Sequence, residues 1–432
     1  MRRKMMTVFG MVLAGAAFAS PIGDALRPIA ESGKVPGICT AVCDAKGEVT
    51  VDCVGYANIE KKTPITEDTI FWIASDTKGI AGTLVLTFVQ EGKIGLDDPV
   101  ENYFPGWKEL YVCEKLPDGK YGPRRPAKTK PTVRNLISHT AGLAFLPGGP
   151  IDTRSMSLMA NLVPTRDLIC EPNTKYNYSN WGIDCAVAIV ELVTGKPWEV
   201  SLQERILDPL GMKSATFWPL EDDVPGSKLA AAYDMSPKSP NYRKAVKTRN
   251  MRHPYTNPQR YAEAGGGLFM TTRDYMKFCQ MILAGGKTPD GKTILTPEAM
   301  KLLTTKQTPA CEKTSYGFGF FWKPETGELS HGGAFNTGYC INLSNHTAHV
   351  FHWQAPGGND DTRTASSLFY TAKRKFLEAS LRKPSVTDSA YGNYGAVENL
   401  KSVPVDATLG DANRTVPVAT GAGEIVVRPP CA

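Results

Sequence analysis

Apolar and polar positions alternate at both ends of the chain, whereas its middle shows helical periodicity. Residues 37–57 alternate on either side of Ala45-Lys46-Gly47, a pattern that predicts a β-hairpin. Further strands are expected at 69–73, 316–322, 338–343 and 349–353.

The strongest helical patterns cover residues 78–91 and 180–193, and each is followed by a glycine, Gly92 or Gly195. Further helices are expected at 132–138, 198–206, 272–283 and 366–381. This order predicts an α+β fold of the kind in which one antiparallel sheet, flanked by helices, is built from both ends of the chain and receives an inserted, mainly helical lobe. We assign the sheet lobe to about 25–74 and 265–382, and the helical lobe to about 75–264.

Both termini differ from this domain of residues 25–382. The chain starts with the basic MRRK, continues with an apolar run and reaches the small-x-small triplet Ala17-Phe18-Ala19, which predicts a cleavable signal peptide over 1–19. The mature protein is therefore expected to be periplasmic or secreted. Residues 383–432 are rich in Pro, Gly, Ser, Thr and Asn and predict an appended tail, in which only EIVV resembles a strand.

The charge and the apolar content of the chain limit the classes of binding partner that we expect. The net charge of +6 is too weak to indicate nucleic-acid binding, and no later apolar run reaches the length of a membrane span. The basic stretch 115–131 is interpreted as a solvated loop, with a patch for an acidic polymer as the alternative. The expected partner is a small ester, amide or peptide substrate, and the sequence predicts no oligomeric state.

All ten cysteines follow the predicted cleavage site. In an oxidising compartment some should pair, and the hairpin register would place Cys39 opposite Cys53. Cys185 and Cys279 fall in helical patterns and are expected to be buried thiols. The chain has no C-x-x-C pair, which excludes zinc-ribbon and thioredoxin-like sites.

Candidate chemistry begins at FWIASDTKGI, residues 71–80, where Ser75 is followed three residues later by Lys78. On one helix face, an amine at this spacing lies near the serine hydroxyl, and apolar surroundings would favour its neutral, basic form. The motif is weak alone, since roughly two such matches are expected by chance in a chain of this composition. A second match, Ser380 to Lys383, precedes Pro384 and is interpreted as accidental.

A serine and a lysine that act together also need a third group that can transfer the proton. Three Tyr-x-Asn triplets occur, and only Tyr178-Ser179-Asn180 lies in a loop directly before a long helix of the middle lobe. A phenol beside a lysine ammonium has a lowered pKa, which suits proton transfer. The alternative for Tyr178 is a loop aromatic that only caps the helix.

These motifs, in this order, resemble the serine β-lactamase and penicillin-binding-protein superfamily, in particular the class C β-lactamase-like esterases and D-peptidases. Its S-x-x-K is matched by Ser75 to Lys78, its Tyr-x-Asn by Tyr178-Ser179-Asn180, and its Lys-Thr-Gly place by His331-Gly332-Gly333 in ELSHGGAFNTGY. Similar stretches are LDDPVENYFP, TVRNLISHTAGL, LGMKSATF and AGGGLFMTTRDYMKF, so the resemblance covers about residues 30–380.

The resemblance implies an enzyme that needs no cofactor or metal. Ser75 would be acylated, Lys78 and Tyr178 would move its proton, and Asn180 would hold the substrate amide or the Lys78 amine. The backbone N–H groups of Ser75 and Ala334 would form the oxyanion hole.

The departure from Lys-Thr-Gly bears on the substrate. A lysine there binds a substrate carboxylate, whereas His331 is mostly neutral near pH 7 and attracts an anion less. Gly332 and Gly333 would let a substrate approach the backbone closely. We therefore expect a small ester or D-amino-acid peptide as substrate, with a true β-lactamase or D,D-carboxypeptidase as the alternative.

Three other interpretations remain open. His346, His349 and His352 recur every three residues, as in a metal site, although strand geometry would turn His349 away from the other two. A non-catalytic binder of cell-wall fragments would keep the fold without the chemistry. A Ser-His-Asp triad could use His139, for which we expect a structural role instead.

Overall fold

The computed structural model describes residues 20–116, 118–145, 156–220, 225–235, 238–239, 244–245, 261–356 and 360–381, with residues 418–419 and 425–426. The chain divides into two units, 1–380 and 381–432. In the second unit, β15 (Val418–Ala419) pairs antiparallel with β16 (Ile425–Val426), part of the predicted EIVV strand. The predicted signal peptide and most of the predicted tail lie outside the described residues.

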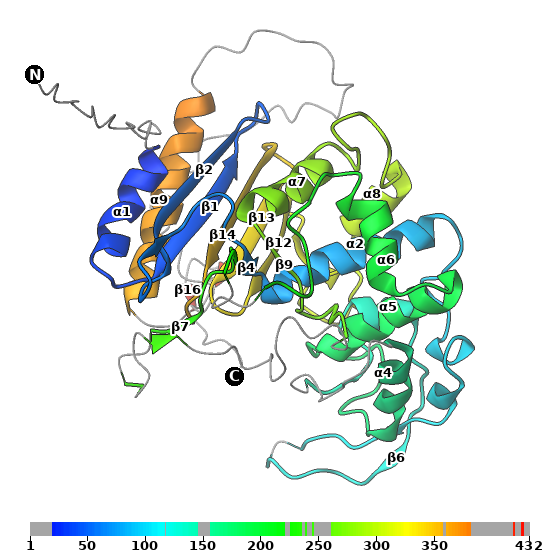
Figure 1. Cartoon of the computed structure of the whole chain (residues 1–432). Helices are drawn as coiled ribbons and strands as arrows, with labels where there is room; N and C mark the ends of the chain where they lie inside the picture. The colour runs from blue at the N-terminus through cyan, green and yellow to red at the C-terminus, as the bar shows by residue number, and fades with distance from the viewer. Residues whose placement is uncertain are drawn as a thin grey trace, which may run out of the picture. The chain divides into compact units, whose positions relative to one another are not determined.

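An eight-stranded sheet organises the first unit, and its strand order is β10-β11-β12-β13-β14-β1-β2-β3 (Figure 1). Its strands are β1 (Gly37–Cys43), β2 (Val49–Asn58), β3 (Thr63–Pro64), β10 (Tyr316–Gly317), β11 (Phe320–Lys323), β12 (Glu328–Gly333), β13 (Thr337–Asn342) and β14 (Thr347–Trp353). All neighbours are antiparallel, and β1 pairs with both β2 and β14. The predicted α+β class, with one sheet built from both chain ends, is confirmed.

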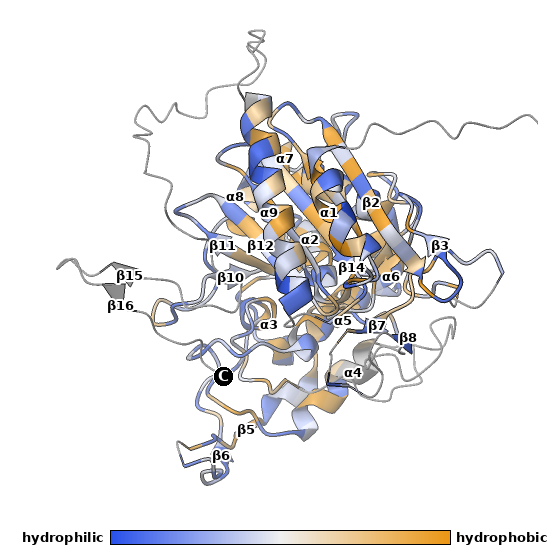
Figure 2. Ribbon diagram, turned by 90° about the vertical axis from the view of Figure 1, so that its left-hand side faces the viewer, coloured by the Kyte–Doolittle hydropathy of each residue, from blue (hydrophilic) through white to orange (hydrophobic). Residues whose placement is uncertain are grey.

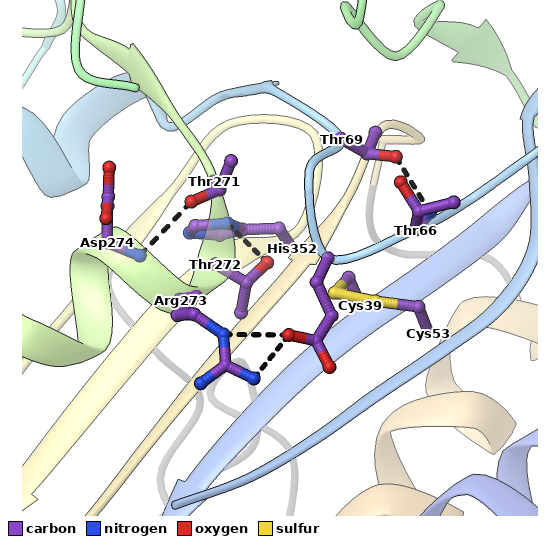
Figure 3. The surroundings of a disulfide bond; sticks show 10 residues. Cys39, Cys53, Thr66, Thr69, Thr271, Thr272, Arg273, Asp274 and His352 are labelled. Carbon is purple, nitrogen blue, oxygen red and sulfur yellow. Dashed lines mark hydrogen bonds and ion pairs between the residues drawn. A yellow bond between two sulfur atoms is a disulfide. The ribbon is translucent and has the colours of Figure 1, made fainter. Parts of the chain in front are cut away.

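The predicted disulfide forms within this sheet. Cys39 on β1 lies opposite Cys53 on β2 and is bonded to it (Figure 3). Cys39 also lies opposite His352 on β14, whose Nδ1 lies 3.1 Å from the Thr272 hydroxyl. The disulfide thus closes the N-terminal hairpin where it meets the C-terminal strands.

Helices cover both faces of the sheet. On one face lie α1 (Pro21–Glu31) and α9 (Asp360–Leu381), side by side in Figure 1. Both are amphipathic (Figure 2), and they bury Leu26 and Phe369 against Val42 and Trp353 of the strands. On the other face α7 (Thr272–Leu283) contacts β1 and β14, and α2 (Thr77–Gln90) is buried over most of its length.

The helical lobe packs around α5 (Asn180–Thr194), which is buried from Asn180 to Val190 and ends at Gly195 with φ of 66°. Its other elements are η2 (Val100–Asn102), η3 (Pro105–Lys108), β5 (Tyr111–Val112), β6 (Arg125–Pro126), α3 (Val133–Ile137), α4 (Met156–Leu162), η4 (Val163–Thr165), α6 (Trp198–Leu202) and a π-helical turn η5 (Gln203–Leu207). The remaining short elements are β4 (Phe71–Trp72) paired with β9 (Phe269–Met270), β7 (Tyr233–Asp234) paired with β8 (Lys244–Ala245), and α8 (Pro297–Leu303).

Several predicted boundaries were wrong. The strand expected at 316–322 is interrupted at Phe318 and Gly319, both at positive φ, because Gly319 lies directly against the Lys78 carbonyl. The helix expected at 198–206 changes to the π-helical turn at Gln203. The last helix begins at Asp360, six residues before the predicted start at Ser366.

The basic stretch 115–131 carries much of its charge in ion pairs. Arg124 pairs with Asp167, Arg125 with Glu114 and Glu171, and Lys130 with Glu101. These pairs favour the solvated-loop interpretation over a binding patch. Among the helices that the structure describes, none has the length and apolar character needed to cross a membrane.

Candidate active site

Ser75 lies in a single 3-10 turn, η1 (Ala74–Asp76), directly before α2. Ala74 has a φ of 47°, a strained backbone for a residue with a side chain. The turn is held by Thr77, whose hydroxyl donates to the Ala74 carbonyl at 2.6 Å and accepts from the Leu268 N–H at 3.2 Å. Ser75 itself is partly exposed, whereas its neighbours Ala74 and Asp76 are buried. The fold therefore presents one hydroxyl from a fixed turn.

Lys78 lies one helical turn after Ser75 and is fully buried. Its ammonium donates to three oxygens: Ser75 Oγ at 3.3 Å, Asn180 Oδ1 at 2.7 Å and the Gly265 carbonyl. The predicted proximity of amine and hydroxyl is thus present. The acceptors come from three separate parts of the chain, so the tertiary fold determines where the amine lies.

Tyr178 lies in the loop before α5, and its ring faces the amine. Lys78 Nζ is 4.6 Å from the centre of this ring. The ring also packs against His139, at 4.6 Å between centroids, and against Phe145, at 5.9 Å. Tyr178 is partly exposed, which leaves it accessible from solvent beside the buried amine.

Asn180 begins α5, and both polar atoms of its side chain bond to other side chains of the protein. Its Oδ1 accepts from Lys78, and its Nδ2 donates to Glu263 Oε1 at 3.0 Å. Of the two roles considered for Asn180, the structure shows contact with the Lys78 amine.

The opposite side is formed by the end of β12 and the turn after it. A Cβ at Gly333 would lie 2.5 Å from the Ile73 carbonyl and 3.2 Å from the Ala74 Cβ, so Gly333 is required by close packing on the serine turn. Gly332 is exposed, and the nearest heavy atom to a Cβ there would be 3.7 Å away. The exposed Ala334 follows Gly333. The two backbone N–H groups expected to form the oxyanion hole therefore belong to segments in contact.

His331 lies on β12 with its ring facing the site. Its ring centroid is 6.0 Å from that of Tyr178, and its Nδ1 lies 2.8 Å from the Gly332 carbonyl. Burial, together with the nearby Lys78 charge, lowers the pKa of His331 to about 3. The imidazole is therefore neutral at physiological pH, and with Nδ1–H donating to Gly332 its Nε2 is an acceptor.

A buried carboxyl next to Ser75 was not singled out from the sequence. Asp76 is fully buried, and its Oδ1 lies 4.0 Å from His331 Nδ1. Burial raises the pKa of Asp76 well above its usual range, which favours the protonated acid. Glu263 and Asp184 were missed as well; Glu263 directly precedes the AGGGLF stretch that carried part of the resemblance.

The other histidine candidates have different surroundings. His139 is buried, its Nδ1 accepts from the Ser179 N–H at 3.2 Å, and burial lowers its pKa well below the usual range. It thus supports the loop that carries Tyr178. On β14, His349 contacts Lys373 of α9, whereas His352 contacts Thr272 of α7, so these two rings lie on opposite faces of the sheet. Within the described ranges, no cluster of three or more His, Cys, Asp or Glu side chains could hold a metal.

Sequence comparison finds a protein family and relatives that match most of the chain. The family model named Beta-lactamase matches residues 22–369. Protein Rv1367c of Mycobacterium tuberculosis is 30% identical over 308 residues, which cover 69% of this chain and 74% of that protein. The lovastatin esterase of Penicillium rubens is 27% identical over 272 residues, or 59% of this chain and 66% of that enzyme.

Comparison of structures gives the same fold. A mutant of the simvastatin synthase LovD from Aspergillus terreus superposes with a TM-score of 0.67 over 85% of this chain and 100% of that chain, at 23% identity. At this identity the likeness concerns the fold.

Proposed function

This chain belongs to the Beta-lactamase family and is a serine hydrolase of that family, and we propose that it cleaves an ester or amide through an acyl-enzyme on Ser75. The observation that carries the proposal is the contact of the buried Lys78 amine with Ser75 Oγ at 3.3 Å, with Tyr178 beside the same amine.

The proposed acylation uses groups already in place. Ser75 Oγ attacks the substrate carbonyl while its proton passes to the Lys78–Tyr178 pair, and the same pair returns that proton to the leaving alkoxide or amine. The backbone N–H groups of Ser75 and Ala334 stabilise the oxyanion that forms between these steps. The pair then activates a water that attacks the acyl-enzyme and releases the acid.

The residues around Lys78 support a proposal for the substrate class. His331 is buried and neutral, and the Asn180 side chain is occupied by Lys78 and Glu263. Such a site has little to attract a carboxylate next to the scissile bond. We therefore favour small, uncharged esters over β-lactams, with D-amino-acid peptides next.

We further propose that the protein acts outside the cytoplasm. The basic start, the apolar run and the Ala17-Phe18-Ala19 triplet support an export signal, and the Cys39–Cys53 disulfide is compatible with an oxidising compartment. N-terminal sequencing of protein exported by the producing cells should begin at Ser20; a retained N-terminus would contradict the export signal.

A fluorophosphonate probe tests the nucleophile directly. The purified protein should be labelled at Ser75, and Ser75→Ala should abolish both labelling and hydrolysis of p-nitrophenyl esters. The matched control is Ser380→Ala, which removes the serine of the second S-x-x-K sequence and should leave both unchanged. Labelling that persists in Ser75→Ala would refute the proposal.

The same protein should be assayed with p-nitrophenyl esters of increasing acyl length, nitrocefin and D-alanyl peptides. Preference for the esters supports the assignment from His331. Efficient turnover of nitrocefin would instead show a true β-lactamase.

A further inference from the structure

Two carboxyl groups are buried together near Lys78. Asp184 lies one helical turn after Asn180 on α5, and Glu263 belongs to the segment that precedes β9. They are only 1% and 5% exposed. Carboxyl groups are rarely buried unless they have partners, so this acid pair, Asp184 and Glu263, needs an explanation.

Each member of the acid pair holds a residue whose oxygen accepts from Lys78. Glu263 Oε1 accepts from Asn180 Nδ2 at 3.0 Å, which orients the amide so that Oδ1 points to the amine. Asp184 Oδ1 accepts from the Gly265 N–H at 3.0 Å, and the Gly265 carbonyl accepts from Lys78. One residue therefore connects each acid to the Lys78 amine: Asn180 for Glu263 and Gly265 for Asp184.

The segment that carries Glu263 and Gly265 is fixed. The indole N–H of Trp198 donates to the Ala262 carbonyl at 2.9 Å, and that of Trp72 donates to the Gly266 carbonyl at 2.6 Å. A Cβ at Gly265 would lie 2.6 Å from the Asn180 Cβ, so the backbone packs directly on the asparagine. Small shifts of either acid would consequently be transmitted to the amine.

We propose that Asp184 and Glu263 form one positioning unit, in which Asp184 is protonated and Glu263 carries a single negative charge that holds Asn180 and the Lys78 amine for acylation. Two carboxylates in one dry site would repel each other, so one proton is retained. Asp184 is assigned the proton because its Oδ2 is buried and has no hydrogen-bond partner among the described residues, so a negative charge there would lack a donor. In agreement, burial and the neighbouring Glu263 raise the pKa of Asp184 well above its usual range.

The other titratable groups near Lys78 are expected to carry no negative charge. Within the part of the chain that the structure describes, the titratable groups near Lys78 besides the acid pair include Tyr178, His139, His331 and Asp76. Burial keeps both histidines neutral and favours the protonated form of Asp76. Among these described groups, Glu263 is the one that we infer to be an anion able to balance an ammonium at Lys78.

The kinetic test rests on the proposed function and compares two isosteric changes. In the wild type, the acidic limb of the pH profile of kcat/KM reports loss of a proton from the Lys78–Tyr178 pair. Glu263→Gln keeps an amide oxygen that can accept from Asn180 Nδ2 and removes only the negative charge that favours the ammonium, so the limb should move to lower pH by about one unit. Asp184→Asn retains an acceptor for Gly265 and changes no charge, so the limb should stay in place.

Asp274→Asn is the control for losing a buried acid elsewhere. Asp274 is also buried, but it bonds Ser214 and Lys277, so its change should alter stability without moving the limb. A limb that stays in place in Glu263→Gln, or that moves as far in Asp184→Asn, would overturn the assignment.

Carbon-13 NMR of carboxyl-labelled protein shows which acid of the pair carries the proton, and it does not require the Glu263→Gln variant. One aspartate carboxyl that remains protonated at pH 7 should be absent from the spectrum of Asp184→Asn. Loss of an ionised signal instead would show that Asp184 carries the charge. This reading does not depend on activity, so an unlabelled Ser75 would refute the hydrolase mechanism while the NMR result still decided the acid pair.

Discussion

The two faces of the large sheet each carry a lysine beside a neutral histidine. On the α2 side, Lys78 donates to the oxygens of Ser75, Asn180 and Gly265, with His331 nearby. On the α9 side, Lys373 lies 3.1 Å from His349 Nδ1, and burial lowers its pKa. Burial also lowers the pKa of His349 well below its usual range.

The difference lies in what surrounds each amine. Three oxygen acceptors, backed by buried acids, fix the position of Lys78 beside a serine. The Lys373 amine contacts the His349 imidazole and lies 5.0 Å from the centre of the Tyr370 ring. A buried lysine is therefore no sign of catalysis by itself. The sign is an amine that is held by fixed acceptors next to a nucleophile.

Replacing each lysine by methionine gives the largest expected contrast. Lys78→Met keeps the stem but removes the amine, and kcat/KM on a p-nitrophenyl ester should fall by about 10²- to 10⁴-fold. Lys373→Met removes the other amine and should leave kcat/KM unchanged. Equal losses in both variants would mean that the two amines act only through stability.

A smaller contrast is expected between two tyrosines of the same loop. Tyr178→Phe retains the ring over Lys78 and removes only the hydroxyl, so a shuttle role predicts a loss of about 10²-fold in kcat/KM. Tyr176→Phe is the matched control, because Tyr176 is also packed on His139 and burial raises its pKa away from any catalytic range. If Tyr178→Phe retains full activity, Lys78 alone moves the proton.

Much of the fold, and the Ser75–Lys78 part of the candidate site, could be predicted from local sequence patterns. The periods of α2, α5 and α7, the hairpin with its disulfide, and the spacing of Ser75 and Lys78 all depend on residues close in the sequence. Alternation within a strand also separated His349 from His352, as the structure confirms.

Of the acceptors around the Lys78 amine, Ser75 and Asn180 were predicted, whereas the Gly265 carbonyl and the two buried acids were not. Gly265 and Glu263 reach Lys78 and Asn180 across more than eighty residues of chain, and nothing local marks such a contact. Asp184 reads as one polar position in an otherwise apolar helix, and its burial depends on the segment that packs over it. The strained φ at Ala74 is likewise imposed by tertiary packing. The two motifs, Ser75 to Lys78 and Tyr178 to Asn180, could thus be predicted from the sequence, whereas Gly265, Glu263 and Asp184 could not.

The smallest expected effect concerns acid stability, where the two faces should behave alike. His331 and His349 are neutral in the folded state, with a pKa of about 3 for His331 and a lowered pKa for His349, and the unfolded chain binds protons on them below about pH 6.5. The stability that each neutral ring contributes is therefore fully present above that pH and is lost as the pH falls, by about 1.4 kcal/mol per pH unit for one proton. His349→Gln should reduce the acid slope of the free energy of unfolding, measured by urea titration between pH 7 and 5, by one proton. It should leave kcat/KM unchanged, because His349 lies on the face without the serine. An unaltered slope would mean that His349 is already charged beside Lys373. The two faces would then share a buried lysine but not a neutral histidine beside it.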